Sequence, residues 1–327
     1  MNYTPMMEQY REVKRQHPQD LLMFRLGDFY ELFFDDAELA ARELEITLTS
    51  REAGSGNRVP MCGVPYHAVE GYIARLIAKG YRVAICEQVE DPKLAKGIVK
   101  REVVRIITPG TILYESALSE RGNNFLVLLA EQEAELSLVA IDISTGECIW
   151  SLHKGADRYA AILNQLSRLS PAELILTDKL ERWSEVNGFL QTRLANCTLT
   201  TFIADESLAA NELLAKHFLR DDIPAEALAV TAIARLLQYL HQTLKSDLSH
   251  INRLTRFNPQ DFLLLDGTTL RNLEISRNMR EGGKRGSLLS ILDFTVTAMG
   301  GRLLRQWLES PLLNLLEIRR RHDAVGE

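Results

Sequence analysis

The chain has 327 residues, of which 46% are hydrophobic and 25% are charged, and its formal net charge is −6. This composition is that of a folded globular protein and excludes intrinsic disorder, while the length allows two or three domains. The acidic balance argues against a protein that holds nucleic acid through a generally basic surface, although it allows local basic patches.

The use of cysteine and histidine predicts reduced thiols and no metal site built from these residues. The four cysteines are widely spaced and form no C-x-x-C pair, and the histidines do not cluster. The N-terminus lacks the basic and apolar regions of a signal peptide, and no apolar run approaches the roughly 20 residues that span a bilayer. We therefore expect a cytoplasmic protein without a membrane partner.

The first predicted elements are a helix, a buried strand and a second helix. Thr4 and Pro5 are typical of a helix N-terminus, and the apolar stripe that follows runs to about His17. The apolar run at residues 21–26 ends at Gly27, which predicts a short buried strand. From Asp35 onward, acidic first-turn residues and helical apolar spacing predict a helix.

Phe29, Tyr30 and Glu31 therefore fall near the junction of a strand and a helix. A side chain there can be held rigidly and still project outward. An aromatic residue beside an apolar strand is, however, more often a core residue, and spacing alone favours that interpretation for Phe29.

Residues 46–49 alternate as a strand would, and the Gly/Ser-rich stretch at 51–59 predicts a loop. The loop carries Arg51 and Arg58, which are either part of a flexible turn or placed to contact phosphate groups. A proline-stiffened segment comes next and is followed by an amphipathic helix at 68–79 and a strand at 81–85.

The densest basic run of the first domain ends within a strand predicted at 103–107 and comprises Lys93, Lys96, Lys100, Arg101 and Arg105. A solvated surface and a phosphate-contacting surface are both consistent with it; phosphate contacts position a protein on DNA without reading sequence. The alternating strands and helices up to this point predict a mixed α/β domain.

The second half of the chain predicts another α/β unit and then helices. Three consecutive strands are predicted, with Gly146 in the hairpin turn between the last two, and a helix and a buried strand follow. From residue 226 onward, helical segments are predicted. The resulting boundaries are 1–110 for the first domain, 111–124 for a linker, 125–245 for the second domain and 246–327 for the helical part.

The stretch GDFYELFFDDA closely resembles the signature at the front of the MutS family of DNA mismatch-recognition proteins. The resemblance covers nearly the whole chain, through VPMCGVPYHAVEGYIARLIAKGYRVAICEQVEDP, VKREVVRIITPGT, LLLDGTTLRNLEI and LLSILDFTVTAMGGRLLRQWLESPL. It implies a mixed-sheet mismatch-recognition domain, a ribonuclease-H-like α/β connector domain and the start of an all-α core domain.

The resemblance also implies site residues and partners. Phe29 and Glu31 match the Phe-x-Glu motif that contacts the mismatched pair, and the stretch with Met61, Pro65 and His67 matches one that borders the DNA minor groove. The implied partners are mismatched double-stranded DNA, a MutL-type protein and, for full-length members, a second copy. A wedge entering at a poorly stacked step would favour mismatches, with Glu31 either protonated and donating to the displaced base or ionised and penalising homoduplex.

Two further expectations concern catalysis. No G-x-x-x-x-G-K-[ST] motif occurs in the sequence, so we expect no ATP hydrolysis, with ATP and magnesium bound only by the family's C-terminal portion, which this fragment-like chain lacks. The rival hypothesis is a metal-dependent nuclease that uses Asp142, which lies on a predicted strand. Two-metal catalysis needs several converging carboxylates, and the sequence indicates no second or third acid on strands.

Overall fold

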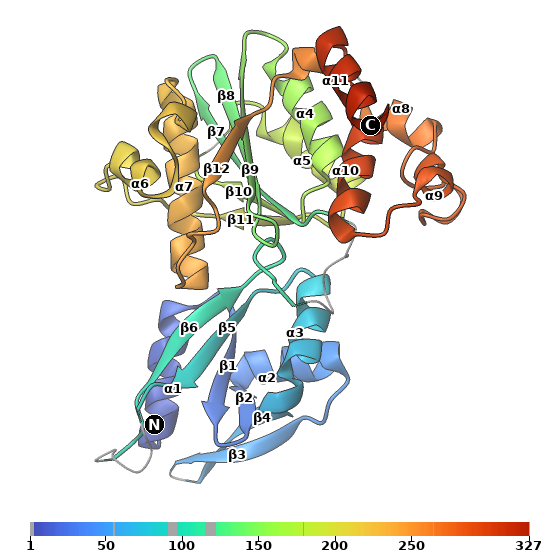
Figure 1. The fold of residues 1–327 in the computed structure, drawn as a ribbon. Coiled ribbons are helices and arrows are strands. Elements are labelled where there is room, and N and C mark those ends of the chain that lie inside the picture. The colour runs from blue at the N-terminus through green and yellow to red at the C-terminus, as the bar shows by residue number, and fades with distance from the viewer. Residues whose placement is uncertain are drawn as a thin grey trace. The chain divides into compact units, whose positions relative to one another are not determined.

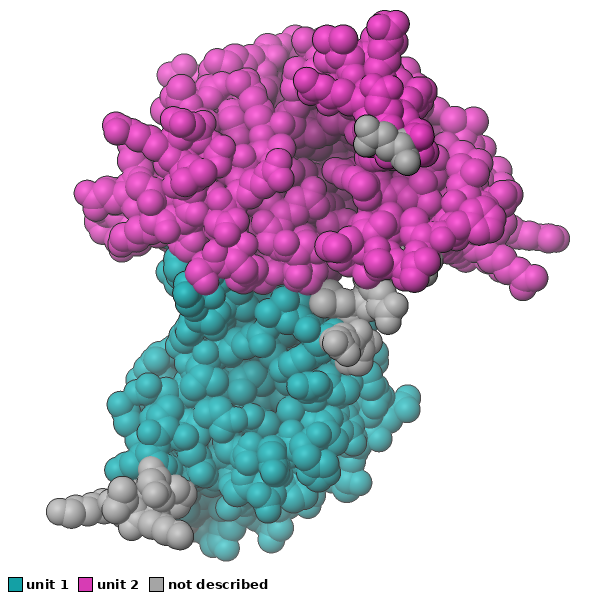
Figure 2. Space-filling model, viewed as in Figure 1, with its two compact units in different colours: residues 1–118, 238–248 teal, residues 119–237, 249–327 magenta. Residues whose placement is uncertain are grey.

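The computed structural model describes residues 3–54, 56–90, 97–114, 122–178, 180–263 and 265–326 (Figure 1). The chain divides into two compact units, coloured separately in Figure 2. The first comprises residues 1–118 and 238–248, and the second comprises residues 119–237 and 249–327.

The first unit contains a six-stranded mixed sheet in the order β3-β4-β2-β1-β5-β6. β1 and β5 are parallel and every other neighbouring pair is antiparallel, which confirms the predicted mixed α/β domain. The strands are β1 (Leu21–Leu26), β2 (Phe29–Phe33), β3 (Thr49–Gly54), β4 (Asn57–Pro65), β5 (Val83–Gln88) and β6 (Arg101–Ile107).

Helices pack on both faces of this sheet, and each face has its own core. On one face lies α1 (Pro5–Gln16), capped by Thr4 as predicted, whose buried residues join apolar side chains of β1, β2 and β6. The other face packs against α2 (Phe34–Leu44) and α3 (Val69–Ala78), the latter preceded by the short η1 (Tyr66–Ala68).

The predicted strand at 46–49 is wrong because β3 begins only at Thr49. The predicted loop at 51–59 is also wrong, because these residues form the β3–β4 hairpin. Arg51 pairs with Val59 and Glu52 with Arg58 across the hairpin. The two glycines of the predicted loop lie at the turn: Gly54, the last residue of β3, has φ +121°, and Gly56 has φ +76°. Glycine content therefore signalled a tight turn, while the residues on either side of it pair as strands.

The second unit contains a six-stranded sheet in the order β11-β10-β7-β8-β9-β12. β7, β8 and β9 form an antiparallel meander, whereas β10, β11 and β12 run parallel to their neighbours. The strands are β7 (Phe125–Gln132), β8 (Glu135–Asp142), β9 (Glu147–Lys154), β10 (Glu173–Leu176), β11 (Thr198–Thr201) and β12 (Arg253–Arg256).

The helices of the described chain beyond residue 122 are α4 (Arg158–Leu169), α5 (Trp183–Arg193), α6 (Ala210–His217), α7 (Ala227–Leu244), α8 (Gly267–Asn272), α9 (Leu288–Leu292), α10 (Ala298–Glu309) and α11 (Leu315–Gly326), with short 3-10 turns η2 (Arg220–Asp222) and η3 (Pro259–Asp261). The prediction of helices alone after residue 226 is wrong at β12. There, only Leu254 of the four residues is buried, so this edge strand has almost no apolar pattern that a sequence could reveal.

The predicted hairpin turn at Gly146 is confirmed. Gly146 has φ +74°, and a Cβ there would lie 2.7 Å from the backbone oxygen of His250. Only glycine fits both the turn and this close approach of another backbone segment.

Candidate nucleic-acid interface

The β1–β2 hairpin places Phe29 at the end of the first sheet. Leu26 pairs with Phe29, so Gly27 and Asp28 form a two-residue turn, and Gly27 takes φ +59° there. The Phe29 side chain is 46% exposed, so the interpretation of Phe29 as a core residue is wrong.

Strand alternation separates the side chains of β2 onto two faces of the sheet. Tyr30 and Leu32 point into the core beneath α2 and α3. Phe29 and Glu31 point to the opposite face, where Glu31 lies across from Phe24 in the register of β1 and β2. The aromatic and the acid of the motif therefore share one face of one strand.

Glu31 forms an ion pair with Arg51, which comes from β3 on the far side of β4. Gly63 lies directly opposite Glu31 in β4. A Cβ at Gly63 would approach Glu31 Cγ to 3.4 Å and Phe29 Cδ1 to 3.7 Å. The Glu31 carboxylate is therefore paired in this structure, and Arg51 is a partner that sequence reasoning missed.

Tyr30 anchors the motif from the buried face. Its hydroxyl donates to Glu87, and burial followed by the neighbouring Glu87 raises the pKa of Tyr30, so the phenol stays protonated. Arg25 lies over the Tyr30 ring at 5.3 Å and over the Tyr66 ring at 4.1 Å. These contacts fix the backbone from which Phe29 projects.

The turn after β4 adds exposed rings near Phe29. Pro65 is paired with Phe29 in register and is half-buried. The Tyr66 backbone N–H donates to Asp28 O at 2.9 Å, and the rings of Tyr66 and His67 are both exposed. Tyr66 was noticed in the sequence only as part of a proline-stiffened segment, because no spacing rule marks an exposed ring beside a neighbouring hairpin.

Two further residues of the β3–β4 hairpin, Met61 and Arg58, were predicted to border DNA, and they differ in their contacts. Met61 lies opposite Phe33 and packs against the core on the α1 face. Arg58 is exposed, and its guanidinium donates to Ser50 Oγ at 2.8 Å and to Ser50 O at 2.9 Å. Arg58 is therefore exposed but bonded to Ser50, whereas Met61 packs against the core.

Arg101 belongs to the predicted basic run but is buried. Arg101 is 8% exposed, lies over the Phe24 ring, and donates to Arg25 O at 2.8 Å and Gln9 Oε1 at 2.9 Å. Its side chain is therefore committed to the core beside α1. Lys100 next to it is exposed and pairs with Glu102 at 2.5 Å.

Arg105 is half-buried and donates to Thr111 O at 3.3 Å. Lys93 and Lys96 lie outside the described residues. Of the predicted basic run, Lys100 alone is thus both described and exposed.

Asp142 has the geometry of a turn residue and not of a metal ligand. It is fully buried, and its two carboxylate oxygens accept from Asn123 Nδ2 at 2.9 Å and from the Ser144 N–H and hydroxyl at 2.9 and 2.6 Å. Among the described residues, no group of three or more Asp, Glu, His or Cys side chains could hold a metal ion. The nuclease hypothesis is therefore not supported.

Three family models match the chain in succession. MutS domain I matches residues 4–116, MutS domain II residues 124–252 and MutS domain III residues 268–327. The two α/β units and the helices after them thus define a modular protein of the class that carries these three domains in this order.

Proteins named DNA mismatch repair protein MutS are similar over almost the entire chain. Those of Desulforamulus reducens, Symbiobacterium thermophilum and Pelotomaculum thermopropionicum are 48%, 47% and 48% identical over 100%, 99% and 98% of this chain, which covers 38% of each. The chain belongs to the MutS family and spans about two fifths of the length of these relatives. No helix among its described residues is long and apolar enough to cross a membrane.

Proposed function

We propose that this chain recognises mismatched base pairs in DNA mismatch repair, with Phe29 as an aromatic wedge and Glu31 as its partner acid. The main support for this proposal is that the Phe29 side chain is half exposed, although the strand that carries it is anchored in the core. The relatives' name, DNA mismatch repair protein, supports the same function for this chain.

The physical basis is the cost of opening a base step. Inserting an apolar wedge from the minor groove requires partial unstacking, which costs a few kcal/mol at a matched step and less at a mismatch. Phe29 meets the requirement of a wedge because it is apolar, exposed and fixed at a hairpin end. Because a mismatched step is easier to deform, the protein should bind it more tightly than a matched step.

The ion pair with Arg51 adds a step to the role of Glu31. DNA phosphates compete with Glu31 for the Arg51 guanidinium, since both accept from the same planar set of donors. Once Arg51 turns to a phosphate, Glu31 either takes up a proton and donates to the displaced base or stays ionised and repels matched DNA. Both alternatives penalise homoduplex relative to heteroduplex.

We further propose that residues 1–110 are the mismatch-recognition domain and 111–124 a linker. Residues 125–245 would be a ribonuclease-H-like connector and 246–327 the start of an all-α core. The antiparallel meander β7-β8-β9 with β10 and β11 added parallel supports the connector assignment.

A MutL-type protein and a second copy are the proposed partners of the whole protein. ATP hydrolysis is assigned to regions outside domains I to III, and the cellular site of action is the cytoplasm.

The test is Phe29→Ala, measured by titration of mismatched and matched duplexes of one sequence. We expect the ratio of the two affinities to approach one, while the melting temperature changes little because the side chain is half exposed. Phe294→Ala is the matched control, since it removes an 88% exposed phenyl group in the second unit and should leave the ratio unchanged.

Phe33→Ala provides the opposite control, because the Phe33 side chain is fully buried four residues away in the same strand. It should cost about 3–5 kcal/mol of stability, as large core truncations do. A Phe29→Ala protein that keeps the full preference for mismatched duplex would overturn the wedge assignment.

A further inference from the structure

Arg25 joins the β1–β2 turn to two segments that come much later in the chain. It belongs to β1, and its side chain is only 18% exposed. Its guanidinium Nε donates to Gly27 O at 2.5 Å, in the turn that precedes Phe29. Its Cζ lies 4.1 Å from the centre of the Tyr66 ring in η1, and its Nη1 lies 3.8 Å from Glu87 Oε1 in β5. One side chain thus contacts the β1–β2 turn, η1 and β5.

The Arg25 guanidinium is itself held in place by its neighbours. Glu87 also accepts from the Tyr30 hydroxyl, and the Tyr30 ring centre lies 5.3 Å from Arg25 Cζ. The backbone oxygen of Arg25 accepts from Arg101 Nε at 2.8 Å, so the main chain is fixed as well. A planar guanidinium with several partners keeps one orientation, and it can therefore restrain the segments that it contacts.

The turn that Arg25 contacts is the one that carries Phe29. The Tyr66 N–H donates to Asp28 O at 2.9 Å, so η1 and the β1–β2 turn meet at this end of the sheet. Nothing lies within 4 Å of the Cβ position at Gly27, which has φ +59°. The turn is therefore held at Gly27 by the hydrogen bond from Arg25 and not by the packing of side chains.

We propose that Arg25 is a positioning residue, which sets the preference for mismatched DNA by holding the β1–β2 turn rigid beneath Phe29. This inference rests on the proposed wedge function of Phe29. A wedge distinguishes two base steps by the energy needed to deform them, and it does so only if the wedge itself does not move. A turn that yields lets the Phe29 ring retreat from a matched step, and the two duplexes then bind with similar affinities.

The test compares Arg25→Met with the unchanged chain in titrations of matched and mismatched duplexes of one sequence. Methionine keeps an unbranched apolar side chain but has no charge and no N–H donor. We expect the ratio of the two affinities to fall at least about fivefold, since a hydrogen bond and two ring contacts are lost at the turn. The affinity for matched duplex and the salt dependence should be retained, because Arg25 acts through Phe29.

Arg25→Lys is the conservative variant and should recover part of the ratio. Its ammonium can still lie over a ring, but it lacks the planar fork that reaches Gly27 O at the same time.

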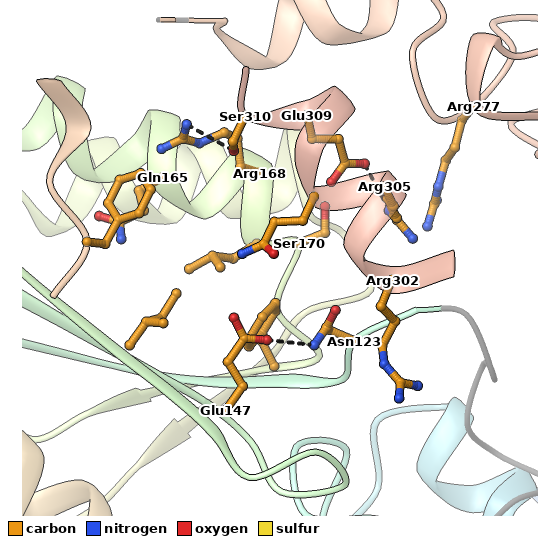
Figure 3. A pocket seen from close by; sticks show the side chains of 15 residues that line it. Asn123, Glu147, Gln165, Arg168, Ser170, Arg277, Arg302, Arg305, Glu309 and Ser310 are labelled. Carbon is orange, nitrogen blue, oxygen red and sulfur yellow. Dashed lines mark hydrogen bonds and ion pairs between the residues drawn. The ribbon is translucent and has the colours of Figure 1, made fainter. Parts of the chain in front are cut away.

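Arg168→Met is the matched control in the second unit. Arg168 is also half-buried; it lies 4.6 Å from the centre of the Phe257 ring and donates to Ser310 Oγ at 3.3 Å, in the pocket of Figure 3. Its replacement removes the same charge and the same kinds of contact. It should leave the ratio of affinities unchanged.

Glu87→Gln tests the same arrangement without altering Arg25, and it decides the matter with Arg25→Lys where Arg25→Met does not fold. The amide still accepts from the Tyr30 hydroxyl but removes the charge that faces the guanidinium. Loss of a carboxylate alone would strengthen the binding of both duplexes, because phosphates are repelled less. We expect the ratio to fall here too, by less than in Arg25→Met, and an unchanged ratio would count against the proposal.

A measurement without DNA separates this proposal from the wedge assignment. In a chain labelled with fluorotyrosine, the fluorine NMR signal of Tyr66 is identified by its absence in Tyr66→Phe, and it should shift in Arg25→Met because the ring loses the guanidinium over it. An unchanged chain without mismatch preference would refute the wedge function, whereas an unshifted Tyr66 signal would refute the positioning role.

Two results of the titrations would also overturn the positioning role. One is an affinity ratio that stays the same in Arg25→Met. The other is an equal loss of affinity for both duplexes with a shallower salt slope, which would make Arg25 a phosphate contact.

Discussion

Phe29 and Phe33 lie on the same face of one short strand, yet the first is half exposed and the second is fully buried. The difference arises from what covers that face. Tyr10 of α1 packs edge-on against Phe33 with 4.9 Å between ring centroids, whereas no core cluster of the described residues includes Phe29. Packing by α1 therefore buries Phe33, whereas Phe29 stays available to a ligand.

At the residue scale, we predict opposite effects on binding when the two members of the Glu31–Arg51 pair are removed. Glu31→Ala should raise the affinity for homoduplex relative to heteroduplex, because a repulsive carboxylate is lost. Arg51→Ala should lower the affinity for both duplexes, because Glu31 loses its counter-charge and the phosphates lose a cation. Titrations of paired and mispaired duplexes measure both.

The stability change should be small in either variant. The Arg51 side chain is 40% exposed, so solvent screens the pair and its coupling energy should stay below about 1 kcal/mol in a double-mutant cycle. Glu31→Gln serves as the isosteric control for loss of charge alone. If Arg51→Ala left the affinity for both duplexes unchanged or raised it, the proposed competition for Arg51 would be wrong.

At the scale of elements, the contribution of β4 to the candidate site comes from a glycine, Gly63. A Cβ at Gly63 would lie 3.3 Å from Tyr30 O, besides its approaches to Glu31 and Phe29. Gly63→Ala should therefore cost about 1 kcal/mol of stability and reduce mismatch preference, because β2 must shift. Gly71→Ala is the matched control, since nothing lies within 4 Å of its Cβ position on α3.

The control should behave in the opposite sense. Gly71 is an exposed residue within a helix, so alanine should stabilise the chain by roughly 0.5–1 kcal/mol and leave DNA binding unchanged. Chemical denaturation and duplex titration of both variants test the pair. A Gly63→Ala chain with unaltered mismatch preference would contradict a role for the close approach.

The corner between α1 and β1 gives the first unit a dependence on pH. Burial alone would raise the pKa of Asp20, but hydrogen bonding from His17 and the charge of Arg82 lower it below its ordinary value of 3.8. Arg82 Nε lies 2.8 Å from Asp20 Oδ1, and Lys14 Nζ donates to the Asp20 backbone oxygen at 2.7 Å. The ionised carboxylate thus joins His17, at the C-terminal end of α1, to Arg82, which directly precedes β5.

Because the pKa of Asp20 is lower in the folded state, its contribution is present above pH 4 and is lost as the pH falls through the folded-state value. We expect Asp20→Asn to cost on the order of 1–2 kcal/mol at pH 7, and the difference from the unchanged chain to shrink towards pH 3. Denaturant titrations at pH 7 and pH 3 measure the free energy of unfolding of both proteins. A penalty that is equal at pH 7 and pH 3 would assign the effect to packing.

At the scale of the whole molecule, a net charge of −6 confines DNA contact to local sites. Lys100 is exposed and is our proposed site of this kind, whereas the neighbouring Arg101 is part of the core. We predict that Lys100→Ala weakens heteroduplex and homoduplex binding about equally and reduces the slope of log K against log salt by about 1.

Arg101→Ala should instead lower stability by on the order of 1–3 kcal/mol, because its hydrogen-bond acceptors Gln9 and Arg25 O lose their donor inside the protein. Salt-dependent titrations alongside thermal melts separate these outcomes. An Arg101→Ala chain that melts normally and has a shallower salt slope would show that Arg101 contacts phosphate.

The sequence by itself determined the order of most elements in both units and the family, because these depend on local signals. Thr4 and Pro5 marked a helix start, apolar periodicity marked the strands and helices of both units, and Gly146 marked a hairpin. It also singled out Phe29 and Glu31 by resemblance. The β3–β4 hairpin escaped it because β3 carries little apolar pattern, and β12 escaped it because its partner β9 is distant in the chain.

Only the tertiary structure decided which side chains are available. Neighbouring residues in the basic run, Lys100 and Arg101, differ in exposure because α1 covers one of them, and Glu31 is paired because β3 brings Arg51 across Gly63. Burial and ion pairing are properties of contacts between elements far apart in the chain. Sequence spacing describes one element at a time, and so it could name the candidate site but could not determine its charge balance.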